Sequence, residues 1–106
     1  MPPEIQQLLR RLKECLSALY GQRLKGVYLF GSCARGEAGA ESDVDVLIVL
    51  DCVDNYVREI DRSSELMAEL SLKFGRSISC VFVSQERWTQ DETMFLINVR
   101  EEAIPA

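Results

Sequence analysis

Hydrophobic residues recur at steps of three and four positions over residues 3–20, which predicts an amphipathic helix. A proline near its start and Gly21 just after its end are typical of helix termini. A similar pattern predicts a second long helix over residues 54–74, ended by Gly75. Its candidate core positions are Val57, Ile60, Leu66, Met67, Leu70 and Phe74.

Three short apolar runs, rich in β-branched and aromatic residues, predict strands over residues 25–30, 44–50 and 77–83. A loop of small residues, 31–42, joins the first two strands, and its first part can form a short helix. The order of elements predicts an α/β fold: a small mixed sheet of about three core strands with helices packed on it, in one domain over residues 1–106.

The last part of the chain is predicted to be a helical tail. Ser84 is its expected N-cap, and the tail carries Trp88, Phe95, Leu96 and Val99 as its large apolar residues.

Two aspartates, Asp43 and Asp45, stand at the start of the otherwise apolar second strand. Residues at i and i+2 of a strand project from the same face, so the two carboxylates would repel each other without a positive charge between them. Magnesium prefers such oxygen ligands and binds through one or two carboxylates plus substrate phosphates. The alternative is that both are solvated residues flanking a turn.

Gly31 and Ser32 leave the first strand at a predicted helix start. Glycine allows close approach of a ligand to the backbone, and amides at a helix start favour phosphate. About ten residues separate this pair from Asp43. If the first two strands pair antiparallel, the glycine turn and the aspartates share one edge of the sheet. The long second helix then permits a parallel crossover to the third strand.

Composition narrows the choice of function. The formal charge is −5, with 17 acidic and 12 basic residues, so we expect no direct nucleic-acid binding. The chain has no histidine, and its four cysteines are scattered, which argues against zinc and against a cysteine nucleophile. Cys15 and Cys80 are expected in the core, and Cys33 could be exposed. Without a membrane-length apolar run or a secretory signal, we expect a cytoplasmic protein.

The run Leu29-Phe-Gly-Ser-Cys-Ala-Arg-Gly36, followed by Ser42-Asp-Val-Asp-Val46, resembles the signature of the DNA polymerase β-like nucleotidyltransferase superfamily, and in particular its minimal nucleotidyltransferases. The resemblance implies that Gly31 and Ser32 bind the β- and γ-phosphates of ATP. It implies that Asp43 and Asp45 are catalytic and hold two magnesium ions. Arg35 would contact the triphosphate, or would be a solvated loop residue.

The third strand departs from the family pattern. Active members carry a third carboxylate near its start, where this chain has Ser79. Glu86, Glu101 or Glu102 could reach in from the tail as a replacement, but the preferred interpretation is that all three are solvated helix charges.

The resemblance implies transfer of AMP to a hydroxyl, such as a tyrosine of a helical HEPN toxin for which the chain is the antitoxin. The alternative is a weakly active or inactive module that neutralises the toxin by binding it. Much of the acceptor site would come from that partner or from a second copy of the chain. Antibiotic adenylylation fits poorly, because only about 23 residues follow the third strand.

Overall fold

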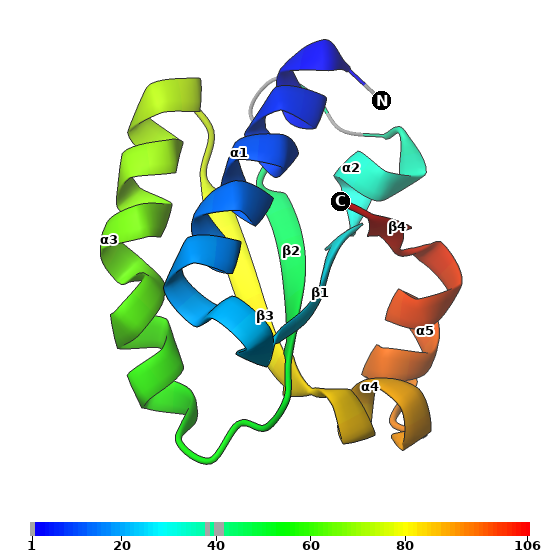
Figure 1. Cartoon of the computed structure of the whole chain (residues 1–106). Helices are drawn as coiled ribbons and strands as arrows, with labels where there is room; N and C mark the ends of the chain where they lie inside the picture. Colours follow the sequence, from blue (N-terminus) through cyan, green and yellow to red (C-terminus); the bar gives the residue numbers. More distant parts are fainter. Residues whose placement is uncertain (1, 38, 40–41) are drawn as a thin grey trace.

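The computed structural model describes residues 2–37, 39 and 42–106. Four strands form one sheet in the order β3-β2-β1-β4 (Figure 1). β1 pairs antiparallel with β2 and β4, and β2 pairs parallel with β3. The predicted mixed sheet is confirmed, and of the two pairings considered for the first two strands the antiparallel one is present. Their bounds are Leu24–Phe30 for β1, Val44–Leu50 for β2, Ile78–Ser84 for β3 and Ile104–Pro105 for β4.

The two long helices lie where the sequence predicts them. Helix α1 spans Pro3–Tyr20 and is followed by a short 3-10 helix, η1, over Gly21–Arg23. Helix α3 spans Tyr56–Phe74 and begins two residues later than predicted. The reason is Asn55, whose side chain accepts a hydrogen bond from the Arg58 amide at 3.1 Å and so caps the helix.

The tail forms two helices rather than one. Ser84 caps α4, Gln85–Gln90, as predicted, and Thr93 caps α5, Met94–Glu102. Between them the Asp91 carboxylate accepts a hydrogen bond from the Thr93 amide at 2.8 Å. This local turn satisfies backbone groups that a continuous helix would otherwise use, and it redirects the chain.

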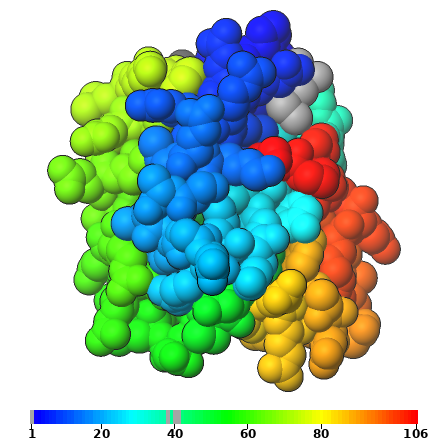
Figure 2. All heavy atoms as spheres, viewed as in Figure 1, coloured from blue at the N-terminus to red at the C-terminus, as the bar shows by residue number. Residues whose placement is uncertain are grey.

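The sheet separates two apolar layers. Helices α1 and α3 cover one face and α4 and α5 lie against the other, as Figure 1 shows. In Figure 2 the atoms of α1 and α3 lie together on the visible side of the molecule. Alternate residues of β2 serve the two sides: Val46 and Ile48 pack toward α1, whereas Leu47 and Val49 pack toward α5. Asp45 therefore projects toward the α4 and α5 side.

Some expected burials are wrong. Val57 is 68% exposed, because it lies on the outer face of α3. Cys33 is buried rather than exposed, because α2 (Ser32–Arg35) folds its side chain onto the core. Cys15 and Cys80 are half-buried at the margin of the core, and all four cysteines are free thiols. No helix among the described residues has the length and apolar character to cross a membrane.

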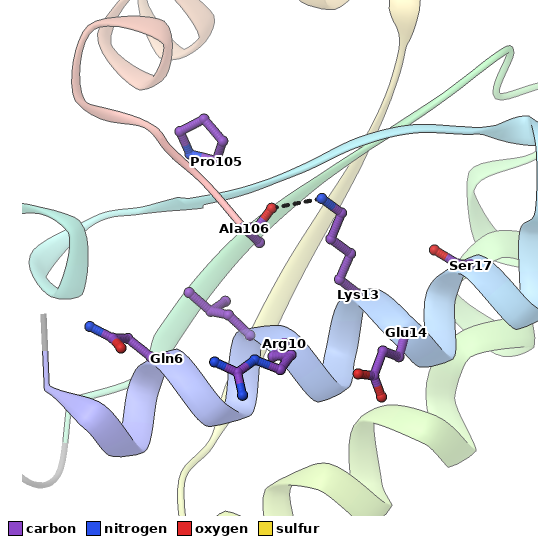
Figure 3. A pocket seen from close by; sticks show the side chains of 8 residues that line it. Gln6, Arg10, Lys13, Glu14, Ser17, Pro105 and Ala106 are labelled. Carbon is purple, nitrogen blue, oxygen red and sulfur yellow. Dashed lines mark hydrogen bonds between the residues drawn. The ribbon is translucent and has the colours of Figure 1, made fainter.

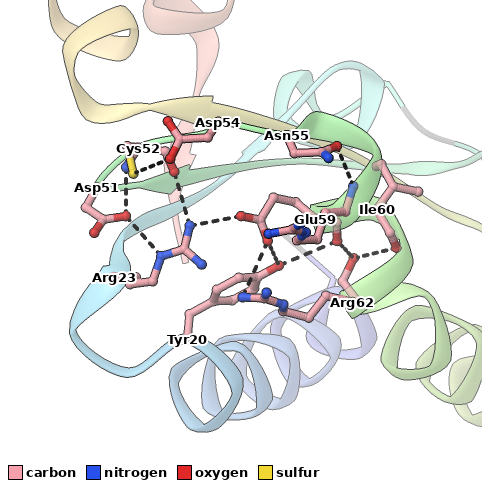
Figure 4. Close-up of polar contacts among 11 residues, drawn as sticks. Tyr20, Arg23, Asp51, Cys52, Asp54, Asn55, Glu59, Ile60 and Arg62 are labelled. Atoms are coloured by element: carbon pink, nitrogen blue, oxygen red, sulfur yellow. Dashed lines mark hydrogen bonds and ion pairs between the residues drawn. The ribbon is translucent and has the colours of Figure 1, made fainter.

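A polar network closes the end of the sheet where β1 begins (Figure 4). The Glu59 carboxylate, only 3% exposed as a residue, accepts hydrogen bonds from Tyr20 Oη at 3.2 Å and from Arg23 Nη2 at 2.9 Å. Arg23 also pairs with Asp51 at 3.1 Å. Burial and the neighbouring charge of Glu59 raise the pKa of Tyr20 to about 12. The network ties α1, β2 and α3 together.

Candidate nucleotide and metal site

The chain turns sharply where β1 ends. Gly31 has a φ of 75°, in the left-handed region that favours glycine, and α2 begins at the next residue, Ser32. A Cβ atom on Gly31 would lie 2.3 Å from Oδ2 of Asp45. The backbone angle favours glycine, and a Cβ at this position would force the Asp45 carboxylate to move. The predicted convergence of the glycine turn with Asp45 is therefore present in the structure.

Asp45 and Asp43 lie at the same edge of the sheet. Asp45 is paired in register with Phe30 of β1 and Ser79 of β3, and Asp43 directly precedes β2. Burial raises the pKa of Asp45, the charges of Asp43 and Glu102 raise it further, and Arg35 lowers it. The charge of Asp43 has this effect because the two aspartate carboxylates lie close together.

Glu102, at the end of α5, reaches this edge from the tail. Its Oε2 accepts a hydrogen bond from the Gly31 amide at 3.1 Å and lies 2.8 Å from Nη1 of Arg35. Its side chain is 23% exposed. The interpretation of Glu102 as a solvated helix charge is therefore wrong, because pairing of β4 with β1 draws the end of α5 over the glycine turn. Glu86 and Glu101 are exposed.

Arg35 ends α2 and lies beside the same turn. Its guanidinium pairs with Glu37 at 3.1 Å and with Glu102 at 2.8 Å, while 48% of its side chain remains exposed. Arg35 is therefore both in contact with solvent and held toward Gly31 by Glu102, which places a positive charge at the entrance of the glycine turn.

Ser79 is exposed and lies opposite Asp45 in the parallel pairing of β2 and β3. The start of β3 therefore reaches the site, as the topology predicted, but it brings a neutral hydroxyl. Within residues 2–37, 39 and 42–106, no group of three or more acidic, cysteine or histidine side chains is close enough to form a metal site by itself.

The residues fit magnesium in one respect that the structure displays. Asp43 and Asp45 offer hard oxygen donors at one edge, and neither carboxylate accepts a hydrogen bond from the described part of the protein. Magnesium is commonly held by one or two carboxylates, with waters and substrate phosphates completing its shell. Asp43 and Asp45 are the residues that would hold it.

A groove lies on the α1 side of the molecule, away from this site. It has a volume of about 670 Å³ and runs between α1 and the end of β4, where Lys13 Nζ donates a hydrogen bond to the Ala106 carbonyl at 2.9 Å (Figure 3). None of Gly31, Ser32, Asp43 and Asp45 lines it. Asp43 and Ser79 are exposed and Asp45 is half-buried, so this edge of the sheet is open to a ligand or a partner.

Comparison with known proteins agrees with this geometry. The model of the nucleotidyltransferase domain family matches residues 9–104. MJ0604 of Methanocaldococcus jannaschii, provisionally named a protein adenylyltransferase, is 38% identical over 97 residues, which are 88% of this chain and 91% of that protein. The protein adenylyltransferase MntA of Thermococcus cleftensis is 37% identical over 70 residues, 66% of this chain and 69% of that protein.

Solved structures share the fold. One described as a minimal nucleotidyltransferase has a TM-score of 0.62 and 28% identity, and the match covers 97% of this chain and 95% of that one. A toxin–antitoxin complex with AMP-PNP has a TM-score of 0.59 and 22% identity, with coverage of 96% and 68%. The resemblance seen in the motif is thus confirmed over nearly the whole chain, which belongs to the nucleotidyltransferase domain family of enzymes.

Proposed function

We propose that this chain transfers AMP from ATP to a hydroxyl group, with Gly31, Ser32 and Arg35 binding the triphosphate and Asp43 and Asp45 holding two magnesium ions. The observation that carries the proposal is the contact between Gly31 and Asp45. A Cβ on Gly31 would fall 2.3 Å from Oδ2 of Asp45. The amides of the turn and the carboxylate are thus close enough to bind the same nucleotide–metal complex. Phosphate binds backbone amides, and divalent metals bridge phosphates to carboxylates.

The chemistry follows from that arrangement. The acceptor hydroxyl gives its proton to solvent and its oxygen bonds to the α-phosphorus, while the bond from this phosphorus to the bridging oxygen of the β-phosphate breaks and pyrophosphate leaves. The Gly31 amide and the Arg35 guanidinium would hold the leaving phosphates and stabilise the charge that develops on them. Bound magnesium supplies further neutralisation of the phosphate charge.

The acceptor we favour is a tyrosine of a helical HEPN-type toxin, with the chain acting as its antitoxin. MntA of Thermococcus cleftensis is named a protein adenylyltransferase, and one fold neighbour is a tri-AMPylated HEPN toxin in complex with its MNT antitoxin. The open edge around Asp43 and Ser79 is compatible with an acceptor carried by a partner protein. We treat residues 1–106 as one nucleotidyltransferase domain, because all described strands join one sheet.

The test uses ATP labelled at either the α- or the γ-phosphate, with magnesium and a HEPN toxin of the kind found in the tri-AMPylated toxin–antitoxin complex as the acceptor. Label from the α-phosphate alone should appear on the acceptor, with a mass increase of one AMP. The double variant Asp43→Asn, Asp45→Asn should lose it. Transfer of the γ-label would indicate a kinase, and absence of any magnesium-dependent ATP binding would reject the site.

A second function, neutralisation of a toxin by binding alone, is supported by Ser79, a neutral residue paired with Asp45 where family members carry an acid. Co-expression separates the two. If the Asp43→Asn, Asp45→Asn variant protects cells from the toxin as well as the parent chain does, binding suffices and transfer is dispensable.

A further inference from the structure

Arg76 is a buried arginine behind the proposed site. It lies between α3 and β3, where Gly75 adopts a φ of 64° and the Arg76 amide donates to the Ser71 carbonyl at 3.2 Å. Only 9% of its side chain is exposed. Arginine is rarely buried to this extent unless its charge is paired. The position of the side chain therefore calls for an explanation.

Within the described residues, the ion pairing of Arg76 is weak. The carboxylate that it pairs with there, Glu4, lies 3.8 Å away and is itself 53% exposed. Its Nε atom is buried and has no hydrogen-bond partner within the described residues. An apolar side chain could fill the same space without the cost of burying an incompletely paired guanidinium. What an apolar side chain could not do is donate hydrogen bonds to the loop above.

Those hydrogen bonds converge on Asp43. Nη2 of Arg76 donates to the Ser42 carbonyl at 2.9 Å, which belongs to the peptide unit that joins Ser42 to Asp43. The same nitrogen contacts Sγ of Cys33 at 3.7 Å, and this thiol donates to the Asp43 carbonyl at 3.5 Å. Both peptide units that flank the Cα atom of Asp43 are therefore held, one by Arg76 directly and one through Cys33.

Asp43 needs such support more than Asp45 does. Asp45 lies inside β2, with strand partners on both sides, whereas the strand begins only at Val44. The first contact of β2 with the chain before β3 is the hydrogen bond from the Val44 amide to the Ser77 carbonyl, at 2.9 Å. The backbone of Asp43 thus lies outside the ladder, and Arg76 and Cys33 replace the missing strand contacts.

We propose that Arg76 is a positioning residue, which sets the place of the Asp43 carboxylate in the magnesium site by holding the Ser42 carbonyl and the Cys33 thiol. The inference rests on the proposed function of Asp43 as a metal ligand. Arg76 does not itself touch the nucleotide. Its guanidinium suits the task because the group is planar, so the N–H bonds of Nη2 point in fixed directions toward the Ser42 carbonyl and the Cys33 thiol.

The test measures the magnesium concentration that half-saturates binding of a non-hydrolysable ATP analogue to the full chain, by isothermal titration calorimetry. Arg76→Met should raise this midpoint about tenfold, the usual lower range for loss of a group that orients a metal ligand. Cys33→Ala, which removes only the weaker thiol link, should raise it less. The control is Arg23→Met, which removes an arginine that pairs with the buried Glu59 carboxylate at the far end of β1, about 20 Å away for seven residues of strand.

Arg23→Met should lower the melting temperature and leave the midpoint unchanged. An unchanged midpoint in Arg76→Met would overturn the inference, as would an equal rise in Arg23→Met, because the effect would then follow stability rather than position. If Arg76→Met does not fold, an unchanged midpoint in Cys33→Ala overturns it. If the parent chain shows no magnesium-dependent binding, the proposed function itself fails, and this result is distinct because it appears without any substitution.

Discussion

The Gly31 amide donates a hydrogen bond to the Glu102 carboxylate at 3.1 Å. The same carboxylate pairs with Arg35. These are the groups that we propose for the triphosphate of ATP. A carboxylate oxygen and a phosphate oxygen cannot occupy one amide together, so ATP must displace Glu102 from the glycine turn before it binds there.

Substitution of Glu102 by glutamine should therefore tighten nucleotide binding. Glutamine keeps the shape but weakens the contact with Gly31 and Arg35, because a hydrogen bond to a charged group is worth more than a neutral one. If the contact of residue 102 with Gly31 and Arg35 weakens by about 1 kcal/mol, the Kd of the nucleotide falls roughly fivefold. The measurement is titration with a non-hydrolysable ATP analogue, and the control is Glu101→Gln, at the exposed neighbouring position. Weaker binding in Glu102→Gln would mean that Glu102 supports the metal ions instead.

The contact of Gly31 with Asp45 allows a matched pair of glycine variants. Gly31→Ala should abolish magnesium-dependent nucleotide binding, because its Cβ would strike Oδ2 of Asp45 at 2.3 Å. Gly36 has nearly the same φ, 74°, but a Cβ there would meet no atom of the described residues within 4 Å. Gly36→Ala should cost about 1 kcal/mol of stability through backbone strain and leave nucleotide binding intact. Equal loss of binding in both variants would contradict the assignment of Gly31.

Ser79 offers a way to restore the missing acid. Because Ser79 pairs with Asp45 in register, Ser79→Asp places a third carboxylate beside the first two. Without magnesium the variant should be less stable than the parent, by about 1 kcal/mol or more, through repulsion between like charges. With magnesium it should bind the metal more tightly and transfer AMP several-fold faster. Ser79→Asn, which adds bulk without charge, should do neither. An unchanged rate with a tighter metal site would indicate that another step limits turnover.

The network around Tyr20 predicts a dependence of stability on high pH. Because the folded chain raises the pKa of Tyr20 from 10.0 to about 12, the neutral phenol stabilises the fold fully below pH 10, and this contribution is lost as the pH rises from 10 to 12. Two pKa units correspond to at most about 3 kcal/mol. Urea unfolding of the parent chain and of Tyr20→Phe between pH 9 and 12 isolates the effect. Parallel stability curves would show that Tyr20 does not contribute.

Much of the architecture follows from local pattern. The apolar spacing of α1, the uniform apolar run of β2 and the caps at Ser84 and Gly75 could all be interpreted from sequence, because each depends on neighbouring residues only. Even the mixed topology was predictable. A short loop of small residues favours antiparallel pairing of β1 with β2, and a long helix allows the parallel crossover to β3.

The contacts that complete the site depend on residues far apart in the chain. Glu102 lies 71 positions after Gly31 and reaches it only because β4 returns beside β1, and a strand of two residues has no detectable pattern. Arg76 and Ser42 are separated by 34 positions. No periodicity distinguishes either side chain from a solvated charge, so the sequence could indicate the pair of aspartates but not the groups that hold them in place.

The sheet places the Arg23–Glu59 network at one end of β1 and Gly31 at the other. Substitutions more than about 10 Å apart with no shared partner usually have additive effects. A variant stabilised by substitutions around Tyr20 and Glu59 should therefore remain folded when destabilising substitutions are made at the glycine turn. In this small protein, substitutions that change the acceptor at one end of β1 would be tolerated because the network at the other end stabilises the fold independently.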